Sequence, residues 1–429
     1  MTTKELADLL RGAPCRIHLI GVAGSGMSGI AALLLALGHR VSGSDKVDTV
    51  EVKRLQSLGL DFHTLQRAAD VVDTQLVVYS SAIRQGNAAF DAARSLGKPM
   101  VRRAEALAAL MLGKKGILVA GMHGKTTVSA MSAHVLRAAG AHPSHYVGAE
   151  IPILGTNARW DDGGEYFVAE GDESDGTIVL YHPEHVIVLN IEPEHLDHYA
   201  DLAAIDAAFG QLLDQTAGKI FYCADDAGAV RICAGRPQSV SYGKTGTYTC
   251  TDIRPAGFAS TFSFCREGQE LARVTLNVPG EHNVVNATAV LTLAAELGLD
   301  MAKCAAALQS FRAARRRFEV LHFSDRHLLV DDYGHHPSEI AAVIRTARDT
   351  GRDRVLLLFQ PHRYTRTQAL RDDFGCALAV ADAVVVTEIY PAGEDPVPGV
   401  SGRLIADAAT MAGCAHAVYI PSREEAGRE

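Results

Sequence analysis

The sequence has no apolar run long enough to span a bilayer. The longest, Ile30 to Leu37, falls far short of the roughly 20 residues that a transmembrane helix needs. The first residues, Met1 to Gly12, lack the basic start and apolar core of a secretory signal. The eight cysteines form no Cys-x-x-Cys pair and no metal-type spacing, so they indicate reduced core residues. We therefore expect a cytoplasmic protein without membrane insertion.

Long runs of one charge sign are also absent, and the net charge is −9. This pattern argues against a nucleic-acid surface and favours small-molecule substrates. The length, 429 residues, exceeds that of one typical core, so we expect two or three domains.

A glycine-rich stretch lies between an expected strand, Ile17 to Ile20, and an expected helix, Ile30 to Leu37. Gly24, Gly26 and Gly29 match the dinucleotide-binding fingerprint in the strand-to-helix context that it requires. The alternative is a glycine turn needed only for helix packing. A redox cofactor is one ligand for such a loop, but nothing downstream resembles a hydride-transfer site. The diphosphate of another nucleotide conjugate is the preferred interpretation.

The next expected strand, Arg40 to Ser44, ends at Asp45, about 20 residues after the loop, where such folds place an acid on a ribose hydroxyl. Further strands at Leu76 to Ser81 and near Pro99 to Val101 continue a βα alternation. The N-terminal part therefore predicts a parallel α/β sheet.

A second glycine loop, Gly121 to Thr127, follows the apolar run Ile117 to Ala120 and precedes an expected helix, Val128 to Arg137. Its backbone N–H groups and the helix N-terminus favour an anion, Lys125 can reach outer phosphates, and Thr126 can ligate Mg²⁺. The strict Walker spacing is not met, but a shortened Gly-x-x-Gly-Lys-Thr loop remains. We expect ATP or GTP here; an incidental glycine turn is the alternative.

Carboxylates follow the next strands. An apolar strand from Tyr166 ends in four carboxylates within six residues, of which Glu170 is the expected Mg²⁺ ligand. An acidic solvated turn is the alternative. The strand His185 to Leu189 leads to His195, which lies among acids and is the candidate for a second metal. Because imidazole is a nitrogen ligand, Mn²⁺ would also be accepted.

The stretch Phe262 to Val278 alternates like an antiparallel hairpin and precedes a helix that runs to Leu297. Asn283 is placed to cap this helix. Equally, the amides of Asn283 and Asn286, one helical turn apart, are placed to bind an adenine edge. Their spacing does not choose between the two.

Three later strands, Leu328 to Val330, Val355 to Phe359 and Ala383 to Val386, each end in a polar loop. We expect these loops along one rim of one sheet. Arg363 and Arg366 are spaced to present two guanidinium groups to carboxylate or phosphate. A solvated basic loop is the alternative.

Together these stretches resemble the Mur ligases, collinearly from Ile17 to about Ala412. The motifs that carry the resemblance are Gly121–Thr127, Glu170–Asp175, Asn190–His195, Gly280–Asn286, Asp331–Pro337 and Gln360–Arg366. It implies an α/β protein of three domains. They are a Rossmann-like UDP-sugar domain (1–105), a central P-loop ATPase with a mostly parallel sheet (106–313), and a Rossmann-like amino-acid domain (314–429). The last sheet is expected to be incomplete, because the sequence ends soon after the expected strand His416 to Ile420.

The resemblance implies an ATP-dependent ligase of peptidoglycan precursor synthesis, with two Mg²⁺ ions. Its substrates would be UDP-N-acetylmuramate, L-alanine and ATP, and an acyl phosphate would be the intermediate. The protein would be a monomer or weak homodimer. The alternatives are a ligase that recycles a ready-made tripeptide and an inactive nucleotide-sugar-binding homologue. Glu194, where the family has aspartate, motivates the second alternative.

The resemblance also implies a set of site residues. The UDP-sugar would contact Gly24, Ser25, Gly26, Met27, Ser28, Ser44, Asp45, Ser80 and Ser81. ATP would contact Gly121, His123, Gly124, Lys125, Thr126, Thr127, His282, Asn283, Asn286, Arg316, Arg317, Asp331 and Asp332. The metals would be held by Thr126, Glu170 and His195, and the catalytic groups would be Lys125, His195, His335, His336, Arg363 and Arg366.

Overall fold

The structure is a computed structural model, and it describes residues 1–194 and 198–428. By its internal contacts the chain forms two compact units. Unit 1 comprises residues 1–251, 262–275 and 285–315, and unit 2 comprises residues 252–261, 276–284 and the chain from Arg316 on. None of the described helices is both long and apolar enough to cross a membrane.

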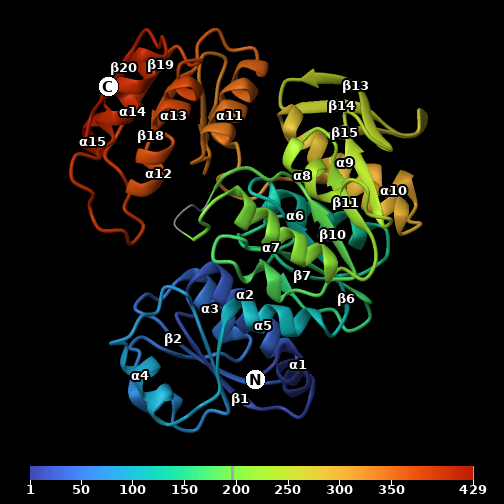
Figure 1. Cartoon of the computed structure of the whole chain (residues 1–429), viewed down its shortest axis with the longest axis vertical. Coiled ribbons are helices and arrows are strands. Elements are labelled where there is room, and N and C mark those ends of the chain that lie inside the picture. The colour runs from blue at the N-terminus through green and yellow to red at the C-terminus, as the bar shows by residue number, and fades with distance from the viewer. Residues whose placement is uncertain (195–197, 429) are drawn as a thin grey trace. The chain divides into compact units, whose positions relative to one another are not determined.

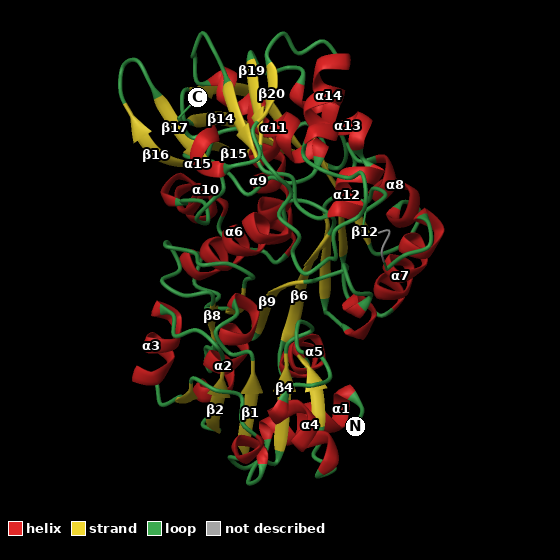
Figure 2. Cartoon of the chain, turned by 90° about the vertical axis from the view of Figure 1, so that its left-hand side faces the viewer, coloured by secondary structure: helices red, strands yellow, loops and turns green. Residues whose placement is uncertain are grey.

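Unit 1 begins with a five-stranded parallel sheet in the order β3-β2-β1-β4-β5. Figure 2 shows β2, β1 and β4 side by side. Because β1 lies between β2 and β4, the first glycine loop follows the strand at which the strand order reverses, where such sheets bind ligands. The strands are β1 Arg16–Ile20, β2 Arg40–Ser44, β3 Asp61–His63, β4 Leu76–Tyr79 and β5 Met100–Arg102.

The helices of this part are α1 Thr3–Arg11, α2 Ser25–Ala36, α3 Val50–Ser57, α4 Ala88–Ser95 and α5 Arg103–Met111, with a 3₁₀ turn at Ala68–Val71. The expected strands are confirmed, but α2 begins at Ser25 rather than at Ile30. Gly24 is its N-cap residue, so Gly26 and Gly29 lie inside the helix.

A ten-stranded sheet follows in the order β15-β14-β13-β12-β11-β10-β6-β9-β7-β8. Its centre is parallel, as predicted, and β6 lies between β10 and β9. The strands are β6 Lys115–Ala120, β7 Ser144–Tyr146, β8 Ala158–Arg159, β9 Tyr166–Glu170, β10 His185–Val188, β11 Ile220–Cys223, β12 Ser239–Gly243, β13 Tyr248–Ala256, β14 Ala259–Arg266 and β15 Gln269–Leu276. The helices are α6 Lys125–Ala138, α7 Leu202–Asp214, α8 Ala227–Cys233, α9 Glu281–Glu296 and α10 Met301–Ser310, with a 3₁₀ turn at Thr177–Leu180.

The predicted hairpin is confirmed as β14 and β15, which are hydrogen-bonded neighbours. Glu267 and Gly268 connect them with φ values of +48° and +85°. Two positive φ values match the twist of a tight hairpin.

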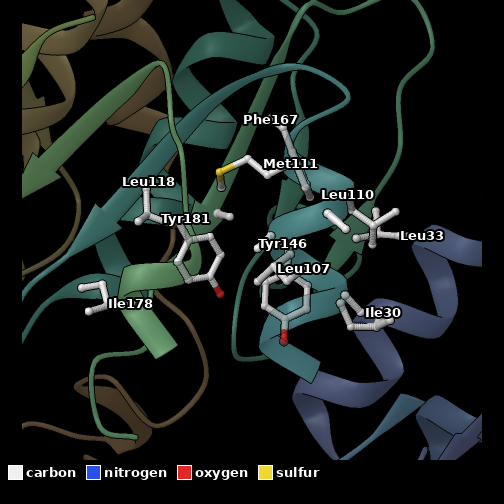
Figure 3. Packing of buried hydrophobic residues seen from close by; sticks show 14 of the residues in the cluster. Ile30, Leu33, Leu107, Leu110, Met111, Leu118, Tyr146, Phe167, Ile178 and Tyr181 are labelled. Carbon is white, nitrogen blue, oxygen red and sulfur yellow. The ribbon is translucent and has the colours of Figure 1, made fainter. Parts of the chain in front are cut away.

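One apolar core joins the first sheet to the central one. Ile30 and Leu33 of α2 and Leu107 and Leu110 of α5 belong to the same buried cluster as Phe167 of β9, and Figure 3 shows these side chains together. The predicted domain boundary at 105/106 thus falls inside a helix whose buried face belongs to the shared core.

Unit 2 contains a parallel sheet in the order β18-β19-β20 and a separate antiparallel pair of β16 and β17. Its elements are β16 Glu319–Phe323, β17 Leu328–Asp331, α11 Pro337–Asp349, β18 Leu356–Phe359, α12 Tyr364–Ala369, α13 Arg371–Leu378, β19 Ala383–Val386, α14 Arg403–Met411, β20 Ala417–Tyr419 and α15 Arg423–Ala426. Figure 2 labels β16 and β17, and Figure 1 labels the others.

The expectation of three strands along one rim of one sheet is therefore wrong for β17. This strand takes its partner from β16, the strand just before it in sequence. A short connection favours this antiparallel pairing. The order of apolar and polar residues along a strand does not show which strand it pairs with.

Candidate functional site

The second glycine loop leaves β6 at Gly121 and enters α6 at Lys125. Gly121 and Gly124 have φ values of +135° and +86°, which favour glycine. A Cβ atom on Gly121 would lie 3.0 Å from the backbone nitrogen of Asn190. The loop therefore needs both glycines, one for close approach and one for the entry to α6.

The amine of Lys125 lies across this loop. It donates hydrogen bonds to the carbonyl oxygens of Gly121 (2.6 Å) and Met122 (3.1 Å) and to Oε1 of Glu173 (2.8 Å). Burial lowers the pKa of Lys125, but the charge of Glu173, with smaller contributions from Glu170 and Asp172, outweighs it and raises the pKa overall. Lys125 is therefore a charged amine at the position expected for an outer phosphate.

Thr126 and Glu170 lie together beside Lys125. The hydroxyl of Thr126 is 3.0 and 3.2 Å from the two carboxylate oxygens of Glu170, and Gly148 N donates to Glu170 Oε2 at 2.9 Å. A hydroxyl and a carboxylate at a helix N-terminus are the donor set that Mg²⁺ prefers. These residues fit the expected metal, whereas His195 lies outside the described residues.

His123 is fixed by the segment after β10. Its backbone N–H donates to Asn190 Oδ1 at 2.7 Å, Asn190 Nδ2 donates to the His123 carbonyl at 3.1 Å, and its ring contacts the carboxylate of Glu192. Thr127 and Glu194 are buried, at 7% and 6% exposure. Sequence reasoning missed Asn190 and Glu173 as partners of the loop, because both are distant from it in the chain.

The start of α9 carries the three residues expected at adenine. Asn283 lies inside the helix and its amide donates to the carbonyl of Pro279 at 2.7 Å, so of the two alternatives the capping one is wrong. Asn286 faces the loop: a Cβ atom on Gly124 would lie 3.2 Å from Asn286 Oδ1. Burial, then the charge of Arg317, lowers the pKa of His282 to about 4.

The residues expected to bind the sugar nucleotide lie in the first glycine loop and at the ends of β2 and β4, and they differ in burial. Ser25 is exposed and donates to the carbonyl of Gly148 at 2.7 Å, and Asp45 Oδ2 accepts from the backbone of Ala23 at 3.0 Å. Ser44 is buried, with its hydroxyl 2.9 Å from Nε2 of His18. Met27 and Ser28 are buried, Gly24 and Ser81 are exposed, and Gly26 and Ser80 are half-buried.

The loops of unit 2 bring several aromatic rings together. The ring of His335 lies 5.4 Å from that of Tyr333 and 5.5 Å from that of His362, which lies 5.5 Å from Tyr390. The loops after β17, β18 and β19 thus meet even though β17 is outside the sheet. Burial, followed by His335, Arg366 and Arg363, lowers the pKa of His362 to about 4.

Arg363 has a φ of +72°, an unusual conformation for an arginine, and Nη1 lies 3.9 Å from Glu394. Arg366 Nη1 lies 3.4 Å from Nδ1 of His362. Sequence reasoning did not place Tyr390 or Glu394 in the site, although both follow a strand in a polar loop.

The other residues predicted in unit 2 hold local structure. His336 caps α11 by accepting from the backbone of Ser338. Arg316 pairs with Asp331 at 3.1 Å, and Arg317 lies 3.4 Å from Glu339. Asp332 accepts from the backbone of Phe318 and Gly334, and burial raises its pKa.

Three family profiles match the chain in order. They are described as the Mur ligase family catalytic domain (residues 16–115), the Mur ligase middle domain (119–294) and the Mur ligase glutamate ligase domain (316–429).

Curated relatives extend over nearly the whole chain. The UDP-N-acetylmuramate–L-alanine ligase of Kineococcus radiotolerans is 43% identical over 423 residues, which cover 96% of this chain and 89% of the relative. The ligase of the same name from Syntrophobacter fumaroxidans is 42% identical over 394 residues, which cover 90% of this chain and 84% of the relative.

Among solved structures, the UDP-N-acetylmuramate–alanine ligase of Thermotoga maritima aligns with a TM-score of 0.81 at 29% identity, covering 96% of this chain and 92% of that one. A UDP-N-acetylmuramate:L-alanyl-γ-D-glutamyl-meso-diaminopimelate ligase from Neisseria meningitides has a TM-score of 0.64 at 28% identity, covering 71% of this chain and 100% of that one. The chain belongs to the Mur ligase family.

Proposed function

We propose that the chain is an ATP-dependent ligase that joins L-alanine to the lactyl carboxylate of UDP-N-acetylmuramate in peptidoglycan precursor synthesis. The observation that carries this proposal is identity above 40% to ligases of that name over at least 90% of the chain. The charged Lys125 beside the Thr126–Glu170 pair supports it, because a phosphoryl transfer needs charge neutralisation there.

In the proposed reaction the lactyl carboxylate attacks the γ-phosphorus of ATP and ADP leaves. Two unit charges about 4 Å apart repel by roughly 4 kcal/mol at an effective dielectric near 20. Lys125 and the backbone N–H groups of the loop would offset this repulsion. Thr126 and Glu170 would hold one Mg²⁺ and His195 a second, which supply Lewis-acid charge stabilisation, and Mn²⁺ would substitute.

The neutral amine of L-alanine then attacks the acyl phosphate, and phosphate leaves. Arg363 and Arg366 would bind a carboxylate or phosphate group. His335 would accept the proton of the amine: its Nδ1 lies 3.1 Å from the carbonyl of Tyr333, so when Nδ1–H donates there, Nε2 is the basic nitrogen. His336, which caps α11, is a weaker candidate.

The test measures phosphate release from ATP, Mg²⁺ and UDP-N-acetylmuramate with no amino acid, with L-alanine, or with the tripeptide L-alanyl-γ-D-glutamyl-diaminopimelate. We expect release with L-alanine. The tripeptide ligase is the second candidate, favoured by the likeness to the Neisseria enzyme. Phosphate release in the tripeptide reaction but not in the L-alanine reaction would establish it. If ATP binds but no phosphate is released in any reaction, the chain is an inactive homologue.

A further inference from the structure

One glycine touches both the first glycine loop and the carboxylate expected at the metal. Ser25 Oγ donates to the carbonyl of Gly148 at 2.7 Å, and the N–H of Gly148 donates to Glu170 Oε2 at 2.9 Å. Gly148 lies just after β7, and we call residues 146–148 the bridging segment. A shift of the first loop is therefore passed to Glu170 through a single residue.

A second hydrogen-bonded route runs in parallel through Tyr146 and Arg103. The hydroxyl of Tyr146 donates to the carbonyl of Gly26 at 3.0 Å and lies 3.2 Å from Nη1 of Arg103. Nη2 of the same guanidinium donates to Asp172 Oδ2 at 2.8 Å, two residues after Glu170. Arg103 thus ties the acidic segment after β9 to the first glycine loop.

Close packing makes this connection stiff. A Cβ atom on Gly26 would lie 2.7 Å from Nη1 of Arg103 and 2.8 Å from the hydroxyl of Tyr146. A Cβ atom on Gly29 would lie 2.8 Å from Cε2 of Tyr146. Because these two positions are glycines, the bridging segment and Arg103 pack directly against α2. A movement of the first glycine loop therefore also moves Tyr146.

The second route is largely shielded from water. Tyr146 is 1% exposed, and the side chains of Arg103 and Asp172 are 26% and 36% exposed. The carboxylate of Asp172 accepts a hydrogen bond from the guanidinium of Arg103 and forms an ion pair with it. A charge-assisted hydrogen bond of this kind is among the stronger polar contacts.

We infer that Arg103 is a positioning residue that couples the two nucleotide sites, so that a sugar nucleotide on the first loop strengthens the binding of Mg²⁺–ATP at the second. The inference rests on the proposed function. A ligand that fixes the first loop also fixes the bridging segment, and thereby Glu170 and Asp172. Because linkage is reciprocal, ATP strengthens sugar-nucleotide binding by the same factor.

Calorimetric titration of the full chain tests this coupling. The affinity for Mg²⁺ with a non-hydrolysable ATP analogue is measured with and without saturating UDP-N-acetylmuramate. We expect the sugar nucleotide to tighten binding about fivefold or more in the unaltered chain, which is the usual range of such coupling. In Arg103→Gln the ratio of the two affinities, with and without UDP-N-acetylmuramate, should fall to about 1.

Matched variants separate coupling from folding. Arg102→Gln makes the same charge change at an exposed neighbour and should keep the ratio. Tyr146→Phe removes only the hydroxyl and should also lower the ratio. It provides the test if Arg103→Gln fails to fold. Arg103→Lys keeps the charge but loses the fork that bridges Tyr146 and Asp172, so it should restore the ratio only in part.

The outcomes distinguish the two proposals. Tight binding of both ligands with an equal ratio in the unaltered chain and in Arg103→Gln would overturn the coupling and leave the ligase function intact. Failure of the unaltered chain to bind UDP-N-acetylmuramate would instead contradict the proposed function.

Discussion

At the residue scale, chemistry-bearing side chains could be predicted from the sequence, but their partners could not. Lys125, Thr126 and Glu170 stand in recognisable patterns, and the structure brings them together. Glu173 and Gly148 complete the same site from separate segments, and only the parallel pairing of β6, β7 and β9 puts them there. Spacing along the chain carries no information on such contacts.

Lys125→Met should slow turnover strongly and also destabilise the chain. The change removes the Lys125 amine from its ion pair with the buried carboxylate of Glu173, which costs about 3 kcal/mol. Turnover should fall about 10²–10³-fold, as for other groups that stabilise transition-state charge. Urea unfolding and phosphate release measure the two effects.

The double variant Lys125→Met/Glu173→Gln separates them. It should recover most of the stability, because neither charge remains, but none of the turnover. If the double variant were as unstable as the single one, the ion pair would not be the cause.

His18 should make the stability of the chain depend on pH. Burial lowers its pKa to about 4, and its ring nitrogens lie 2.8 and 2.9 Å from the hydroxyls of Ser42 and Ser44. The unfolded chain takes up this proton near pH 6.5 and the folded chain only near pH 4. Stability is therefore lost as the pH falls from about 6.5 to 4, by about 3 kcal/mol from this residue.

Urea unfolding between pH 4 and 7 measures this loss. His18→Asn should make the pH dependence shallower by about this amount, whereas His182→Asn, at an exposed site, should leave it as in the unaltered chain. If the free energy of unfolding of His18→Asn changed with pH as steeply as that of the unaltered chain, His18 would not be a source of the pH dependence.

At the element scale, the predicted strands and most helices are correct, because buried parallel strands appear as apolar runs bounded by glycine loops. The start of α2 was missed, since Gly26 and Gly29 look like turn residues unless their neighbours Arg103 and Tyr146 are known. The pairing of β17 with β16 was missed because strand order depends on contacts that polarity does not encode.

Gly124→Ala should weaken ATP binding, and Gly38→Ala is its control. The two glycines have φ values of +86° and +84°, so alanine strains both alike, by about 1 kcal/mol. Gly38 has open space around its Cβ position, whereas that of Gly124 lies against Asn286 and Leu189 in the phosphate loop. We expect both variants to lose stability, Gly124→Ala by more, but at least a tenfold loss of ATP affinity only in Gly124→Ala. Equal affinities would show that the loop tolerates a methyl group.

At the scale of the whole molecule, the two compact units have separate cores. We expect two transitions in scanning calorimetry, because chains of several units seldom unfold in one step. UDP-N-acetylmuramate at 100 times its Kd should stabilise only the unit that contains the first glycine loop, by about 2.7 kcal/mol. A shift of the other transition alone would contradict the assignment of the sugar nucleotide to the first glycine loop.

The core shared by α2, α5 and the central sheet has a consequence for protein engineering. A fragment cut at residue 105 would leave apolar side chains such as Ile30 and Leu33 facing water, and it would aggregate rather than fold. Chimaeras between family members should therefore exchange the first sheet together with α5 and the segment around Tyr146. The smallest transplantable module is thus larger than the first sheet alone.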